Sequence, residues 1–276
     1  MELKLHENVT FEDYAKIDAV NYSSLKHMRR SPMHYRYRMD HPEEPTEAML
    51  LGTAAHRAIL EPDRLGDFAI WTGGRRYGRE WDAFCADHEG QQILRADDAA
   101  HVAGIVTAVH RNETARNYLR RGQSEVVALW EMFGRKFKGR LDRWIQEDNL
   151  VLDLKTCRDC RSWAFGAQAY KLGYHMQAAM YADAVRTLTG IEPAMRILAV
   201  ENKPPFESAV YRVPPEVLQL GRGEYVELVG RLFECELSAL WPAEIEHECD
   251  LRLPAYTLAS SGDDEDMSDL NLEGLE

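Results

Sequence analysis

The sequence lacks the long apolar runs and paired cysteines that mark membrane proteins and disulfide-rich secreted proteins. No apolar stretch approaches the roughly 20 residues that a membrane-spanning helix requires, and the N-terminus carries no signal-peptide pattern. The five cysteines are odd in number and scattered along the chain, which argues against a disulfide framework. We therefore expect a cytoplasmic protein with no membrane partner.

An overall excess of positive charge is also missing. The net charge of −13 by itself disfavours a nucleic-acid partner. However, seven acids and no base lie between Asp263 and Glu276, and without them the net charge is −6. Two stretches are basic: residues 21–39 hold five Lys/Arg and no acid, and residues 135–143 hold five Lys/Arg and one acid. These stretches could contact nucleic-acid phosphates or could be solvated basic faces, and charge alone favours neither.

Length and composition are typical of a globular protein with a substantial core. The chain has 276 residues, of which 45% are hydrophobic and 29% charged. The residue patterns divide it into a helical N-terminal part (residues 1–120), a core rich in strands (residues 121–259) and an acidic tail (residues 260–276). Because the tail is acidic and poor in aromatic residues, we expect it to be disordered.

The N-terminal part shows helical periodicity in two long segments. Residues 47–61 have apolar side chains at three- and four-residue spacing, with enough glycine and alanine to allow close packing. His56 lies on this predicted helix, where a single histidine is more often structural than a ligand. Residues 77–119 also look helical, with breaks at Gly90 and Gly104.

A short apolar stretch, Val151–Thr156, carries an acid and a lysine. Its aliphatic composition predicts a buried strand, and alternation along a strand places Asp153 and Lys155 on the same side. A carboxylate and an ammonium are costly to bury unless they pair with each other or bind a metal. An isolated D-x-K pattern is more often a structural ion pair, so the motif gains weight only from its neighbours.

The preceding segments predict an antiparallel meander. Residues 137–145 form a second predicted strand with Asp142 on it, and the polar residues 146–149 predict the turn of a hairpin. A third strand is expected at residues 124–130. Two aspartates and a lysine would then meet on one sheet face. This combination suits a Mg²⁺ site, which needs hard oxygen ligands and a cation beside the attacking water.

The remaining segments complete an α/β fold with a mixed central sheet flanked by helices. A long helix is expected at residues 162–188, and on it Gln177 and Tyr181 are four residues apart and share a face. The helical N-terminal part would complete a cleft. Further strands are expected at residues 195–200 and 208–213, and a further helix at residues 215–240.

Taken in order, these motifs resemble those of the PD-(D/E)XK nuclease superfamily, whose core is restriction-endonuclease-like. Within it they are similar to the RecB-like branch, and most of all to RecE-type exonucleases. Each motif alone is weak, but their order and spacing are specific, and the resemblance covers nearly the whole chain outside the acidic tail. The motifs are Gly52-Thr-Ala-Ala-His56, Glu125, Gly139-Arg-Leu-Asp142, Asp153-Leu-Lys155 and Gln177-Ala-Ala-Met-Tyr181.

The resemblance implies a Mg²⁺-dependent exonuclease, with Mn²⁺ as a substitute, that digests linear double-stranded DNA. It implies 5′→3′ digestion that leaves 3′ single-stranded tails for a RecT-like single-strand annealing protein in phage recombination. It also implies a homo-oligomeric ring, a tetramer before a trimer. Two alternatives share the motifs: a structure-specific or single-strand endonuclease, and a catalytically silent DNA-binding protein.

The resemblance also assigns roles to individual residues. The metal ligands would be His56, Asp142, Asp153 and the backbone carbonyl of Leu154. Lys155 would orient or activate the attacking water, and Glu125 would serve a second metal position. The substrate contacts would come from Gln177, Tyr181, Arg29 and Arg30.

Cys157 and Cys160 follow the Lys155 strand directly and form a Cys-x-x-Cys pair. Some RecB-like nucleases hold an iron–sulfur cluster, but such a cluster needs four cysteines in a pattern that this chain does not show. From the sequence we therefore expect neither a cluster nor a zinc site here.

Overall fold

A six-stranded mixed sheet forms the centre of the protein. In this computed structural model, which describes residues 1–43 and 46–251, the strand order is β1-β4-β5-β6-β7-β8. Strands β6 and β7 run parallel, and the other neighbours are antiparallel. The strands are β1 (Leu5–His6), β4 (Gln123–Met132), β5 (Arg135–Ile145), β6 (Leu150–Cys157), β7 (Ala194–Glu201) and β8 (Ser208–Val213). The predicted meander is thus confirmed as β4-β5-β6.

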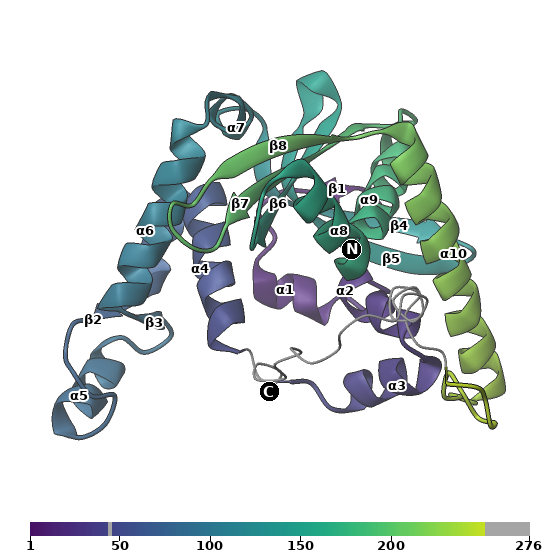
Figure 1. Cartoon of the computed structure of the whole chain (residues 1–276), viewed down its shortest axis with the longest axis horizontal. Helices are drawn as coiled ribbons and strands as arrows, with labels where there is room; N and C mark the ends of the chain where they lie inside the picture. Colours follow the sequence, from purple (N-terminus) through teal and green to yellow (C-terminus); the bar gives the residue numbers. More distant parts are fainter. Residues whose placement is uncertain (44–45, 252–276) are drawn as a thin grey trace, which may run out of the picture.

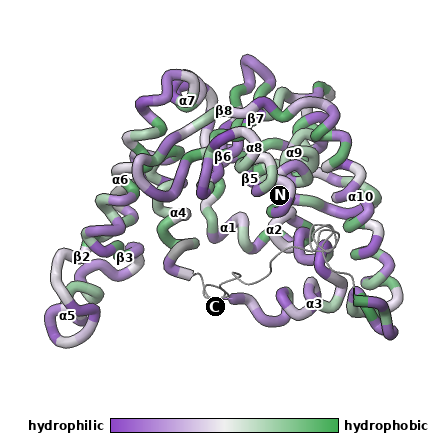
Figure 2. The backbone as a smooth tube through the Cα atoms, viewed as in Figure 1, coloured by the Kyte–Doolittle hydropathy of each residue, from purple (hydrophilic) through white to green (hydrophobic). Residues whose placement is uncertain are grey.

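Helices cover both faces of this sheet (Figure 1). One face packs against α9 and α10, and the other against α4 and α6, so that two hydrophobic clusters enclose the sheet. Along α10 the residues change between hydrophobic and hydrophilic (Figure 2), as expected for a helix with one buried face. The bounds are α4 (Glu47–Leu60), α6 (Ala96–Arg111), α9 (Tyr174–Thr189) and α10 (Pro215–Ser238).

The remaining elements are short. A separate two-stranded parallel sheet joins β2 to β3 and, with α5, extends away from the main sheet (Figure 1). The elements are α1 (Phe11–Lys16), α2 (Tyr22–Leu25), α3 (Pro32–Asp40), β2 (Phe68–Trp71), α5 (Arg79–Asp87), β3 (Gln92–Arg95), α7 (Glu113–Leu119) and α8 (Ser162–Leu172), with 3₁₀ turns at Lys26–Arg29, Pro62–Asp67 and Gln146–Asp148.

Two helix predictions were wrong in detail, each at a glycine. The helix expected at 162–188 is two helices, because Gly173 between α8 and α9 adopts φ +74°, a conformation that ends a helix. Conversely, Gly104 does not break a helix but lies inside α6. A Cβ atom there would lie 2.4 Å from the Phe206 ring, so the glycine permits close packing.

The predicted α/β class with a mixed central sheet is confirmed. Strand β1 joins the edge of the main sheet, and α4 and α6 share a hydrophobic core with it. The division at residue 120 stays a prediction, and the acidic tail, residues 260–276, lies outside the described residues. Within the described ranges, none of the helices combines the length and hydrophobicity needed to cross a bilayer.

Candidate metal centre

Three acids lie in one row across β4, β5 and β6. Glu125 and Asp142 are opposite each other, because the positions on either side of them are paired across β4 and β5. Asp142 and Asp153 occupy the first positions beyond the last backbone pair that joins β5 to β6. The three acids therefore lie where the backbone pairing between β4 and β5 and between β5 and β6 is interrupted. This interruption leaves room for their carboxylates to contact a ligand.

Glu125 stands at a backbone irregularity. Its φ is +58°, in the left-handed region that residues other than glycine rarely adopt. This conformation costs on the order of 1 kcal/mol, and it interrupts the β4–β5 pairing at Glu125. Such strain tends to occur at functional sites, and here it accompanies an acid that is only 7% exposed.

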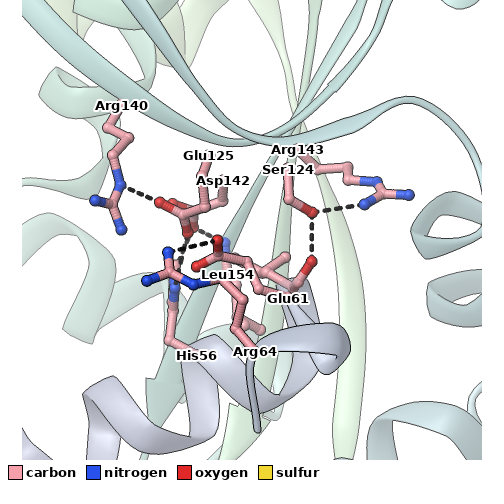
Figure 3. A network of polar contacts seen from close by, with 10 residues as sticks. His56, Glu61, Arg64, Ser124, Glu125, Arg140, Asp142, Arg143 and Leu154 are labelled. Atoms are coloured by element: carbon pink, nitrogen blue, oxygen red, sulfur yellow. Dashed lines mark hydrogen bonds and ion pairs between the residues drawn. The ribbon is translucent and has the colours of Figure 1, made fainter. Parts of the chain in front are cut away.

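His56 of α4 meets this row from a distant part of the chain. Its Nε2 lies 2.9 Å from Asp142 Oδ2, and its Nδ1 lies 3.5 Å from Glu125 Oε1 (Figure 3). The helix approaches closely because the buried positions next to His56 are small. These are Ala54, Ala55 and Ala58.

His56, Glu125 and Asp142 form a group that fits a divalent cation. One ligand atom from each lies within 4.8 Å of the other two. Within the described residues, Asp153 Oδ1 is buried without a hydrogen-bond partner, and both Glu125 oxygens are buried with ion-pair contacts to His56 and Arg140. Carboxylate oxygens suit both Mg²⁺ and Mn²⁺, and the imidazole nitrogen suits softer ions than Mg²⁺ prefers, so Mn²⁺ also fits.

The structure arranges the predicted ligands differently from the sequence assignment. Glu125, expected at a second metal position, joins His56 and Asp142 in one group of potential ligands. Asp153 is buried next to them and bonded to Lys155. Leu154 contacts the site through its backbone N–H, which donates to Asp142 Oδ2 at 2.6 Å. Ligation by Asp153 and by the Leu154 carbonyl stays a prediction.

The charges of these groups are strongly coupled. Burial lowers the pKa of His56, but the Asp142 and Glu125 carboxylates outweigh it and raise that pKa to about 10. Burial raises the pKa of Asp142, but the His56 cation and other neighbours outweigh it and hold the pKa below its ordinary value. The histidine is therefore a cation at neutral pH, and an ion that uses its nitrogen must displace its proton.

Lys155 lies beside Asp153, as the D-x-K pattern predicts. Its Nζ is 2.6 Å from Asp153 Oδ2 and 5.1 Å from the centre of the Tyr174 ring. Burial lowers the pKa of Lys155, but the Asp153 and Asp142 carboxylates raise it above its ordinary value. Burial also raises the pKa of Asp153 to about 6, against the effect of the lysine. Lys155 is thus a fixed cation beside the row of acids.

Arg140 is a member of the site that the sequence reasoning missed. Its Nε is in ion-pair contact with Glu125, and its guanidinium lies 5.3 Å from the centre of the Phe11 ring. Figure 3 shows Arg140 and His56 pointing toward the carboxylates from different elements. The signal lies inside the Gly139-Arg-Leu-Asp142 motif, in which only Asp142 is assigned a role from the sequence.

Gln177 and Tyr181 lie on α9, which packs against the sheet face to which Asp153 and Lys155 also point. Gln177 Nε2 donates to the Tyr181 hydroxyl at 3.1 Å, and Tyr181 is 7% exposed. A Cβ atom on Gly139 would lie 2.8 Å from the Tyr181 ring, which explains the glycine three residues before Asp142. This is a supporting contact, and the predicted substrate contact of both residues stays a prediction.

Arg29 and Arg30 differ in their surroundings. The Arg29 guanidinium donates to the backbone carbonyls of Lys171 at 2.9 Å and Tyr170 at 3.5 Å, at the end of α8. Arg30 is exposed. The structure therefore gives Arg29 a structural role at a helix C-terminus, and DNA contact by either arginine stays a prediction.

Comparison with known proteins agrees with this fold. The family model described as "PDDEXK-like domain of unknown function (DUF3799)" matches residues 21–252, and the chain belongs to this family. The crystal structure of a putative exonuclease from Eubacterium rectale has a TM-score of 0.66 at 17% identity, covering 93% of this chain and 99% of that chain. The solved structure of SSO0001 has a TM-score of 0.35 at 16% identity, covering 85% of this chain and 93% of that chain. No curated protein matches the sequence.

The family and the fold together define a PD-(D/E)XK nuclease-like protein. The family match extends over both the helix that carries His56 and the meander that carries the acids. The residues of the candidate site, His56, Glu125 and Asp142, all lie within the matched region.

Proposed function

We propose that this protein is a Mg²⁺-dependent deoxyribonuclease that digests linear double-stranded DNA from its ends. The observation that carries the proposal is the convergence of His56, Glu125 and Asp142, from three separate elements, beside the cation of Lys155. The solved neighbour described as a putative exonuclease supports the same class.

The proposed reaction follows from charge. A phosphodiester is anionic, so attack by water requires neutralisation of the charge that develops on the phosphate. A bound divalent cation supplies that neutralisation and lowers the pKa of water. The residues that would hold such an ion are His56, Glu125 and Asp142. Lys155, fixed by Asp153 and the Tyr174 ring, offers an N–H donor to the water or to a phosphate oxygen.

The finer features of the proposal rest on the resemblance to RecE-type exonucleases. They are 5′→3′ digestion, 3′ single-stranded tails for a RecT-like annealing partner, and a homo-oligomeric ring, a tetramer before a trimer. The basic residues 21–39, which include 3₁₀ and helical segments near α10, provide positive charge for a DNA backbone.

A timed digestion tests the proposal. Linear duplex labelled at either the 5′ or the 3′ end, and a covalently closed circle of the same sequence, are incubated with the protein and Mg²⁺. We expect early release of the 5′ label from the linear duplex and an intact circle. The Asp142→Asn variant should be inactive, and Asp87→Asn, a change at an exposed site in α5, should retain activity.

Other outcomes would replace the proposal. Cleavage of the closed circle would indicate an endonuclease, and early release of the 3′ label would reverse the polarity. Binding of DNA without cleavage in either Mg²⁺ or Mn²⁺ would indicate a catalytically silent DNA-binding protein.

A further inference from the structure

Two cysteines and two glutamates gather at the far end of β6. Cys157, the last residue of β6, is paired in parallel register with Glu201, the last residue of β7. Cys160 follows three residues later, and the two cysteines are only 2% and 3% exposed. This cluster lies outside the group formed by His56, Glu125 and Asp142.

The turn between β7 and β8 brings the second glutamate to the first. The backbone N–H of Glu201 donates to the carbonyl of Glu207 at 2.9 Å. The ring of Phe206, within this turn, packs closely against Gly104 of α6. Because the turn is fixed against a helix, the two glutamates are held together by the fold.

Cys160 completes a compact group with these glutamates. Its backbone N–H donates to Glu201 Oε1 at 3.2 Å. Its sulfur and one oxygen from each of Glu201 and Glu207 all lie within 4.8 Å of one another. Cys157, at the end of the adjoining strand, is the nearby second thiol.

The loop that carries the cysteines is held at both ends. The N–H of Asn202 donates to the Cys157 carbonyl at 2.8 Å, and the Tyr211 hydroxyl donates to the Cys160 carbonyl. Asp159 and Arg161, on either side of Cys160, form an ion pair at 2.5 Å. The thiols therefore occupy a built loop, with positions set by β7 and β8.

The two glutamates of the cluster have no directly paired cation among the described residues. In residues 1–43 and 46–251, neither Glu201 nor Glu207 forms an ion pair, and the nearby Arg161 is engaged by Asp159. Burial raises the pKa of Cys157 to about 12, with smaller contributions from Cys160 and Glu201. Burial also raises the pKa of Cys160 to about 11, with smaller contributions from Glu201 and Glu207. Two carboxylates beside two protonated thiols are an arrangement that a bound cation would stabilise.

We propose that Cys157, Cys160, Glu201 and Glu207 form a second metal site, which takes Zn²⁺. Sulfur ligands select Zn²⁺ over Mg²⁺ and Ca²⁺, and carboxylate oxygens are regular zinc ligands alongside them. On binding, the two thiol protons pass to solvent and the sulfurs ligate as thiolates. The site joins the end of β6, two residues after Lys155, to the β7–β8 turn, so its role is structural.

Cobalt absorption tests the site independently of any nuclease activity. The full-length protein is stripped of metal with a chelator and titrated with Co²⁺, whose thiolate complexes absorb in the near ultraviolet. We expect a thiolate band that saturates at one Co²⁺ per chain and is abolished by Zn²⁺. Cys160→Ser and Cys157→Ser should each weaken or remove the band. The matched control Cys85→Ser, in α5, should keep it.

Two further variants separate this site from the catalytic one and from effects on folding. Asp142→Asn should keep the cobalt band, because it alters only the other cluster. Glu207→Gln changes an exposed side chain, and we expect it to weaken Zn²⁺ binding about 10-fold with an unchanged circular dichroism spectrum. Absence of a thiolate band in the wild-type protein, or a band of full intensity in Cys160→Ser, would overturn the proposal. An unchanged Zn²⁺ affinity in Glu207→Gln would overturn the proposed ligand set.

Discussion

Strand β6 contributes to two acid-rich clusters that differ in their counter-charges. The first lies around Asp153 and the second around Cys157, four residues further along the strand. In the first, each acid contacts a cation. These pairs are Glu125 with Arg140, Asp142 with His56, and Asp153 with Lys155. In the second, within the described part of the chain, the two glutamates have no ion-paired cation.

This difference suggests what each cluster is built to hold. A centre that cleaves phosphodiesters must accept both a metal cation and an anionic phosphate, so charges of both signs are useful in it. A metal bound at the first cluster would compete with the His56 proton and the Arg140 guanidinium, which favours weak and exchangeable binding. The second cluster offers only thiols and carboxylates, which suits tight binding of one cation.

The largest expected effect comes from removing the central acid of the first cluster. Asp142→Asn keeps the shape of the side chain but removes the charge that contacts His56 and accepts from the Leu154 N–H. We expect the rate of DNA cleavage to fall by about a thousandfold or more, because transition-state charge is no longer stabilised. A single-turnover digestion of linear duplex measures it, and a rate within tenfold of wild type would remove Asp142 from the mechanism.

The next largest effect is expected at Lys155, which lies outside the group formed by His56, Glu125 and Asp142. Lys155→Ala removes an N–H donor while leaving His56, Glu125 and Asp142 in place. We expect cleavage to fall by about a hundred- to a thousandfold, with Mn²⁺ affinity within a few-fold of wild type. The matched control is Lys16→Ala, at an exposed site. Retained turnover would show that Lys155 serves only as a structural partner of Asp153.

Arg140→Ala would leave Glu125 without its arginine partner, so that the first cluster, like the second, would contain a carboxylate with no paired arginine or lysine. The buried Glu125 carboxylate loses its ion pair, which should lower the metal-free free energy of unfolding by about 1–3 kcal/mol. Because a competing cation is removed, Mn²⁺ should bind more tightly. Urea denaturation and Mn²⁺ titration measure the two effects, with Arg111→Ala as an exposed control. Weaker Mn²⁺ binding would indicate that Arg140 positions Glu125 for the metal.

The smallest effect is expected on the supporting helix. Tyr181→Phe removes the hydroxyl that accepts from Gln177, at a cost of about 1 kcal/mol in the free energy of unfolding. The ring still packs against Gly139, so cleavage should stay close to the wild-type rate. The exposed Tyr77→Phe is the control for the urea denaturation. A large loss of cleavage with unchanged stability would instead indicate that the hydroxyl contacts the substrate.

Local patterns predicted the parts of the fold that depend on nearby residues. The meander followed from alternating strands and a polar turn, and the helix around His56 followed from its apolar spacing. The breaks expected at Gly104 and missed at Gly173 show the limit of such patterns. A glycine that ends a helix and one that admits a neighbouring ring look the same in the sequence, because the neighbour, here Phe206, is distant in the chain.

The candidate sites show the same limit. Asp153 and Lys155 were paired by strand alternation, which is a local property. The contact between His56 and Asp142 came only with the family resemblance. The left-handed backbone of Glu125, which accompanies its place in the metal group, has no signature in the sequence. Counting cysteines alone likewise gave no reason to expect a site at Cys160, because its carboxylate neighbours arrive from another hairpin.

Mn²⁺ binding in the absence of DNA tests the central claim most directly. It is measured by the paramagnetic resonance signal of free Mn²⁺ in a Cys160→Ser background, which removes the second site. We predict a Mn²⁺ site that is lost or weakened at least tenfold by each of His56→Ala, Glu125→Gln and Asp142→Asn, and that is unchanged by Asp87→Asn. Unaltered Mn²⁺ binding in all three variants would contradict a metal centre at the crossing of α4, β4 and β5.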